Sequence, residues 1–94
     1  MQIRWTPAAL RDLAAIRAYI ATDDPRSAAR QIARVLDAIG RLSGFPMSGR
    51  VGRRSGTREL VVARTPYIVA YRVRSDDIEL LRILHGRQHW PDRL

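Results

Sequence analysis

The sequence predicts an α+β fold in which a small antiparallel sheet, in the order β-α-α-β-β-β, carries an N-terminal helical hairpin on one face. Two observations predict it. Two consecutive stretches near the N-terminus repeat apolar residues at helical spacing, and the C-terminal half alternates apolar and polar residues with a period of two. If the chain of 94 residues formed two domains, each would be too small to bury a core. We therefore expect a single domain over residues 1–94.

The N-terminal half predicts a strand followed by the hairpin. Residues 2–5 alternate polar and apolar side chains, which indicates a short strand that adds to the sheet edge. A helix is expected over residues 7–22, because Thr6 can cap it and Pro7 suits its first turn. Asp24-Pro25 repeats this start signal for a second helix. Its apolar stripe consists of Ala28, Ile32, Val35, Ile39 and Leu42. Two such helices with a short connection should form an antiparallel hairpin.

The C-terminal half predicts three strands after a long polar loop. Residues 47–57 hold three glycines and three arginines, and loops of this length are often functional or mobile. Strands are expected over residues 60–63, 67–74 and 78–85, joined as an antiparallel meander. In the middle strand Tyr67, Val69, Tyr71 and Val73 share one face. The last strand is apolar almost throughout, which favours a central position buried on both faces.

Composition excludes several kinds of site. There is no cysteine, so disulfides and thiolate zinc sites are excluded. The two histidines, His85 and His89, have no clustered carboxylate beside them, and no glycine-rich phosphate loop precedes a helix. We therefore expect neither a metal nor a cofactor. No long apolar run and no secretion signal occur, so we expect a cytoplasmic protein without a membrane partner.

Charge is the feature that points to a partner. All seventeen basic residues are arginine, and nine acidic residues leave a net charge of +8. A small chain with this excess attracts phosphates or an acidic protein through its long-range field. Composition alone does not distinguish these partners.

Arginines in the loop and in the strands are the candidate site residues. Those of the loop region concentrate positive charge, with a solvated loop as the alternative: Arg50, Arg53, Arg54 and Arg58. Arg72 lies inside a strand and needs a partner, for which Glu59 or Glu79 in a structural ion pair is the simplest choice. Arg82 and His85 are expected to converge near the end of the last strand, where a guanidinium could hold a phosphate or a carboxylate. A structural role is the alternative for His85.

Several motifs resemble the RelE/ParE superfamily of type II toxin–antitoxin toxins. They are Trp5 ahead of a helix with Asp12-Leu13 and Tyr19-Ile20, Phe45-Pro46-x-x-Gly49-Arg50, Arg58-Glu59-Leu60-Val61-Val62, the Tyr67–Val73 strand and the Leu81–Gln88 segment. Each is weak alone, but their order and spacing cover nearly the whole chain. The resemblance implies a bacterial toxin that a cognate acidic antitoxin neutralises, with operator DNA bound only through the antitoxin.

Two branches of this superfamily act differently. ParE-like members inhibit DNA gyrase and are not hydrolases, whereas RelE-like members cleave mRNA on the ribosome. Ile68 stands where the RelE-like strand commonly has an arginine, and no tyrosine follows Tyr71, which favours the ParE-like branch. His85 and Trp90 favour the RelE-like branch instead. We expect a gyrase inhibitor rather than an enzyme. The alternatives are a ribosome-dependent mRNA endoribonuclease and a non-toxic binding module.

The resemblance also suggests which residues matter. Candidate contacts with the target or the antitoxin are Arg50, Arg53, Arg54, Arg58, Arg82, His85, Arg87 and Trp90. If the protein is a ribonuclease, the candidate catalytic group is Arg58, Arg72, Arg82 and His85. The antitoxin interface is expected to include the groove beside the first helix and the sheet edge. Charge reversal at Arg53 and Arg54 is expected to weaken antitoxin association in a salt-dependent way.

Overall fold

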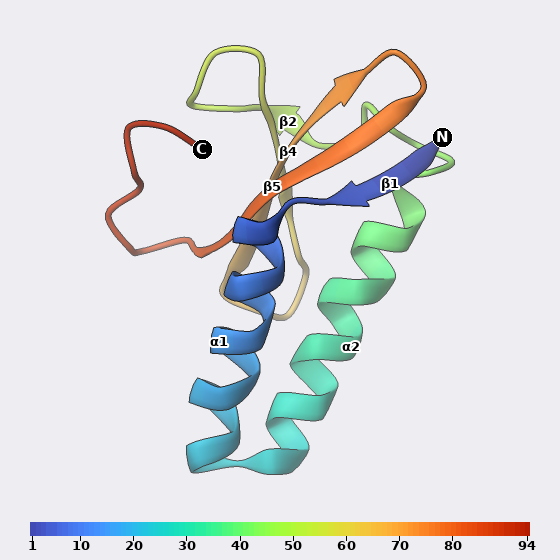
Figure 1. Ribbon diagram of the computed structural model, residues 1–94. Helices are drawn as coiled ribbons and strands as arrows, with labels where there is room; N and C mark the ends of the chain where they lie inside the picture. Colours follow the sequence, from blue (N-terminus) through green and yellow to red (C-terminus); the bar gives the residue numbers. More distant parts are fainter.

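Two helices and five strands make up the chain, and the computed structural model describes all of residues 1–94 (Figure 1). The elements in chain order are β1 (Gln2–Trp5), α1 (Pro7–Asp23), α2 (Pro25–Arg41), β2 (Arg50–Val51), β3 (Arg58–Val61), β4 (Tyr67–Arg74) and β5 (Asp77–His85). The strands form one sheet in the order β1-β5-β4-β3-β2. The α+β fold is confirmed.

The hairpin starts where the sequence signals placed it. The hydroxyl of Thr6 accepts a hydrogen bond from the backbone N–H of Ala9, and Pro7 opens α1. The carboxylate of Asp24 accepts from the N–H groups of Arg26 and Ser27 at the start of α2. In Figure 1 the two helices lie antiparallel and project beyond the sheet. Neither helix combines the length and the hydropathy that a membrane-spanning helix needs.

Strands β3, β4 and β5 form the expected antiparallel meander, but β1 pairs with β5 in parallel. Gln2 lies opposite Asp77 and Trp5 opposite Leu80. Parallel neighbours need a long crossover, and the chain between β1 and the meander, with its helical hairpin, supplies it. The sheet is therefore mixed, with one parallel pair at its β1 edge.

The segment expected to be a long loop contains the short strand β2. Arg50 pairs with Glu59 and Val51 with Arg58. The buried hydroxyl of Tyr71 holds the entry to this strand, because it donates to the carbonyl of Pro46 at 2.8 Å and accepts from the N–H of Gly49 at 2.9 Å. Because β2 offers it a partner, β3 begins at residue 58, two residues before the predicted start.

The sheet separates two apolar clusters. The larger one lies under the hairpin and includes Tyr67, Val69 and Tyr71 of β4. The smaller one lies on the opposite face, where Ile68, Ala70 and Leu84 pack against Trp90 of the C-terminal tail. The predicted alternation along β4 is confirmed. Strand β5 lies between β1 and β4, and it buries apolar side chains on both faces as predicted.

Candidate functional site

The sheet face away from the hairpin collects most of the candidate arginines. Residues directly opposite each other in antiparallel strands share a face, and Ala70 belongs to the cluster on this side. Glu59 and Arg82 both lie opposite Ala70. The same pairing places Arg50 opposite Glu59. We call this surface the arginine face and define it by Arg50, Arg53, Arg54 and Arg72. Arg82 leaves β5 on this face, but its guanidinium binds Asp12 of α1.

A buried carboxylate organises one end of the arginine face. The side chain of Glu59 is 3% exposed and accepts from the Arg50 guanidinium at 2.9 Å, the Arg53 guanidinium at 3.1 Å and the Arg53 N–H at 2.7 Å. Burial alone would raise the pKa of Glu59, but the hydrogen bonds from Arg53 and Arg50 outweigh it and lower this pKa. Glu59 stays ionised at neutral pH, and two guanidiniums share its single charge.

The C-terminal tail, residues 86–94, lies across the same face. The guanidinium carbon of Arg53 lies 3.6 Å from the centroid of the Trp90 ring, a cation–π contact. Arg54 donates to the carbonyl oxygen of Pro91 at 2.8 Å. Arg53 and Arg54, predicted as partner contacts, therefore also hold the tail, whose Trp90 is 4% exposed and packs against the sheet.

A basic hollow of about 320 Å³ lies between the tail and the sheet. Its lining residues are Arg54, Ser55, Thr57, Arg72, Leu81, Asp92, Arg93 and Leu94. Three guanidiniums face one carboxylate there, so the hollow favours anionic groups.

Two strand arginines have internal partners. Arg72 pairs with Glu79 at 2.7 Å, which confirms the predicted structural ion pair. Arg82 makes a bidentate pair with Asp12 of α1, at 2.7 and 2.9 Å, and Asp12 also accepts from the N–H of Ile83. The hydrogen bonds with Asp12 raise the pKa of Arg82 although burial opposes the shift. The sequence reasoning noted Asp12 only within the Asp12-Leu13 motif of the family resemblance and missed its pairing with Arg82.

The four residues proposed for a ribonuclease site do not share a face. Arg58 lies opposite Tyr71 and His85 opposite Tyr67, so both belong to the hairpin side. Arg72 belongs to the arginine face, and Arg82 leaves β5 on that face before its guanidinium reaches Asp12 of α1. Arg82 and His85 therefore do not converge as expected, since residues three apart in a strand point to opposite faces.

The hairpin-side candidates also have internal partners. Arg58 donates to the carbonyl of Gly49 at 2.8 Å. The His85 ring lies edge-on to Tyr67, with the centroids 5.9 Å apart, and its Nδ1 accepts from the N–H of Arg87. The side chain of Arg87 is exposed in the turn after β5. No cluster of three or more potential metal ligands occurs in the structure.

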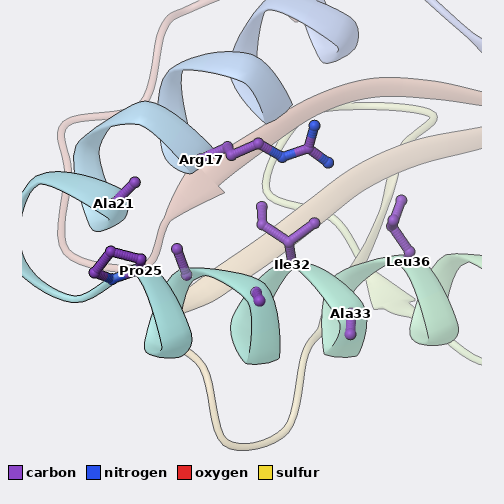
Figure 2. A pocket seen from close by; sticks show the side chains of 8 residues that line it. Arg17, Ala21, Pro25, Ile32, Ala33 and Leu36 are labelled. Carbon is purple, nitrogen blue, oxygen red and sulfur yellow. The ribbon is translucent and has the colours of Figure 1, made fainter.

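An apolar groove of about 420 Å³ runs between the helices, as Figure 2 shows. Arg17 and Ala21 of α1 line one side of it. The lining residues from α2 are Pro25, Ala28, Ala29, Ile32, Ala33 and Leu36. Alanines keep the groove open, and Leu36 is 40% exposed at one end. The structure thus contains the groove that was expected beside the first helix.

This fold and its arginine face define a small basic domain of the RelE/ParE type. A family model described as the ParE toxin of type II toxin–antitoxin system, parDE, matches residues 3–90. The chain belongs to this family and is a toxin of the type II toxin–antitoxin class.

Relatives and solved structures agree with this assignment. The chain is 52% identical to "Putative toxin Y4kP" of Sinorhizobium fredii over 93 residues, which cover 99% of this chain and 96% of the relative. It is 39% identical to Toxin RelE2 of Caulobacter vibrioides over 85 residues, covering 90% and 94%. A chain of the chromosomal ParDE system from P. aeruginosa matches with a TM-score of 0.79 and 28% identity, covering 90% and 95%. A chain of the toxin–antitoxin complex RelBE2 from Mycobacterium tuberculosis matches with a TM-score of 0.58 and 31% identity, covering 89% and 95%.

Proposed function

We propose that this toxin inhibits DNA gyrase through protein contacts made by the arginine face. The observation that carries the proposal is that Arg58 and His85 lie on the hairpin side of the sheet and Arg72 on the opposite face, while Asp12 of α1 holds the Arg82 guanidinium. A ribonuclease that works by electrostatic stabilisation needs its charged groups around one scissile phosphate. Here the groups lie on two faces, and each is held by an internal partner. An inhibitor needs only a complementary surface, which the arginine face offers to an acidic protein.

The second candidate is a ribosome-dependent mRNA endoribonuclease. The basic hollow beneath the tail favours it, because Arg93 and the guanidinium nitrogens of Arg54 and Arg72 that their internal partners leave free could hold a phosphate there. In this function the catalytic group would be the arginines of the hollow. His85 would take no part, since it lies on the other side of the sheet.

We also propose that a cognate acidic antitoxin covers the hairpin groove. The groove is apolar along α2 and has a guanidinium, that of Arg17, on its α1 side. An amphipathic helix whose apolar face carries one flanking carboxylate fits this arrangement. Operator DNA would then be bound only through the antitoxin, and the toxin would meet both partners in the cytoplasm.

A supercoiling reaction with purified gyrase and relaxed plasmid tests the proposal. The toxin, released from its antitoxin, should abolish supercoiling, and added antitoxin should restore it. His85→Ala, which touches only the hairpin side, should inhibit as well as the parent toxin. Full supercoiling with a folded toxin would contradict the gyrase proposal, and inactivity on ribosomes as well would indicate a non-toxic binding module.

A further inference from the structure

A second cavity lies at the tip of the hairpin, and its chemistry differs from the rest of the surface. It measures about 320 Å³ and lies where the helix–helix turn meets the start of β4 and the end of β5. We call it the tip cavity, and its lining residues are Tyr19, Ile20, Asp23, Asp24, Ser27, Gln31, Pro66, Tyr67 and His85. Arginines line the hairpin groove, the hollow beneath the tail and the hollows beside α2 and β2. None lines the tip cavity, although the chain has seventeen.

The cavity is rich in hydrogen-bond acceptors that lack donors. Asp23 is exposed and takes part in none of the ion pairs of the chain. Asp24 uses Oδ1 to cap α2, which leaves Oδ2 available. The amide oxygen of Gln31 is buried and has no hydrogen-bond partner, while its amide nitrogen donates to Ser27. The acceptors that a ligand can reach are the exposed carboxylate oxygens of Asp23 and Asp24, which favour a ligand with several donors.

Aromatic rings form the remaining wall. Tyr67 and His85 pack edge to face, and Tyr19 is 73% exposed nearby. Burial, and then the nearby Tyr19, raise the pKa of Tyr67, so the phenol stays neutral at physiological pH. Carboxylates beside aromatic rings suit a planar cation with several N–H donors. A guanidinium has this form, because it stacks on rings and forks onto carboxylates.

We propose that the tip cavity receives an arginine side chain of the antitoxin. This inference rests on the proposed antitoxin partner. The cavity and the hairpin groove flank the same turn, with Ala21 and Asp23 on α1 and Pro25 and Ser27 on α2. An antitoxin segment that leaves the groove around this turn reaches the cavity. The net charge of +8 disfavours a basic side chain over the molecule as a whole, so a cavity that accepts one fixes the register of the antitoxin.

The direction in which one substitution changes antitoxin affinity distinguishes this contact from the long-range electrostatic attraction of the whole toxin. Asp23→Asn makes the toxin more basic, so long-range attraction alone would leave the binding of an acidic antitoxin unchanged or strengthen it. With an arginine in the cavity, the same change should weaken antitoxin binding about tenfold. Asp37→Asn is the matched control, since it makes the same change of charge on an exposed α2 residue outside the cavity.

The experiment measures antitoxin affinity by calorimetry for the parent toxin, Asp23→Asn and Asp37→Asn, with the full-length proteins. A loss confined to Asp23→Asn supports the proposal. Equal affinity for the two variants overturns it while leaving the antitoxin partner in place. If the parent toxin itself binds no antitoxin, the proposed function fails instead.

A small probe tests the cavity apart from the antitoxin. N-acetyl-arginine amide should give saturable NMR shifts at Ser27, Gln31 and Tyr67, and Asp23→Asn should reduce them. N-acetyl-citrulline amide has the same shape without the charge and should shift these signals much less. Equal shifts from both compounds, or arginine shifts centred elsewhere, would overturn the cavity as a guanidinium site.

Discussion

Asp12 provides the polar contact between α1 and β5. Its carboxylate accepts hydrogen bonds from the Arg82 guanidinium and the N–H of Ile83. The side chain of Asp12 is 16% exposed and that of Arg82 is 26% exposed. Asp12→Ala leaves a half-buried guanidinium and a strand N–H without an acceptor, so it should lower the free energy of unfolding by about 2–3 kcal/mol.

Urea denaturation checks this value, with Asp37→Ala as the exposed control that should change stability by less than about 0.5 kcal/mol. The loss of stability in Asp12→Asn should lie between those of Asp12→Ala and Asp37→Ala, because its amide oxygen can still accept from the N–H of Ile83. A parent-like midpoint for Asp12→Ala would contradict the account.

Glu59 makes stability depend on pH in a defined direction. Its folded-state pKa lies below the ordinary value of 4.5, so the carboxylate contributes its full stabilisation above about pH 4.5. That contribution is lost as the pH falls through the folded-state value. Glu59→Gln should therefore be less stable than the parent at pH 7, and the difference should shrink below about pH 4.5. Denaturation across this range measures it, and a difference that stays constant down to about pH 3 would contradict the assignment.

At this scale the sequence predicted contacts within the sheet better than contacts across layers. Alternation along the strands was enough to suggest the pair between Arg72 and Glu79. The partner of Arg82 could not be predicted, because Asp12 is seventy residues away in the chain and meets it only through tertiary packing. The expected convergence of Arg82 with His85 ignored the period-two alternation of a strand.

Among the elements, the turn into β2 depends on a glycine. A Cβ on Gly49 would lie 2.6 Å from the ring and the hydroxyl of Tyr71, which is fully buried. Gly49→Ala must displace this side chain, so it should cost about 2–3 kcal/mol of stability. Gly40→Ala is the matched control: nothing lies within 4 Å of the added methyl group in α2, and the change should stabilise by about 0.5–1 kcal/mol. Thermal unfolding of both variants tests the pair, and equal effects would contradict the packing described.

The elements themselves were largely predictable. Caps at Thr6 and Asp24 and the following prolines marked both helix starts within a residue. The parallel pairing of β1 was not predictable, because four residues carry no information on their neighbour. Strand β2 was missed because two residues with exposed side chains have no apolar alternation to detect.

For the whole molecule, net charge and the groove together should govern antitoxin association. Arg17→Gln removes a guanidinium from the groove and should weaken antitoxin binding about five- to tenfold, mainly through faster dissociation. Arg11→Gln removes the same charge from an exposed site of α1 outside the groove and should mainly slow association. Stopped-flow kinetics at two salt concentrations separates these effects. Equal dissociation rates for the two variants would contradict the groove as the docking site.

Arg17 is a better probe of antitoxin binding than the loop arginines. Charge reversal at Arg53 or Arg54 would also break the contacts with Glu59 and with the C-terminal tail. The salt-dependent effect expected of those reversals stays a prediction, and its measurement needs a control for the position of the tail.

Motif order along the chain was enough to predict the class of the molecule, but the arrangement of its site was not. The buried Glu59 gathers Arg50 and Arg53 over β3, and carbonyl oxygens of the C-terminal tail hold Arg54. The sequence suggested Glu59 only as a possible partner of Arg72. The tip cavity joins residues from both helices and two strands, so no local pattern could indicate it.

The most direct test of the central claim measures DNA cleavage and mRNA cleavage with one toxin sample. We predict that purified gyrase, plasmid and toxin accumulate cleaved DNA, and that translating ribosomes with the same toxin leave their mRNA intact. Intact DNA together with cut mRNA would contradict the gyrase proposal and favour the ribosome-dependent endoribonuclease instead.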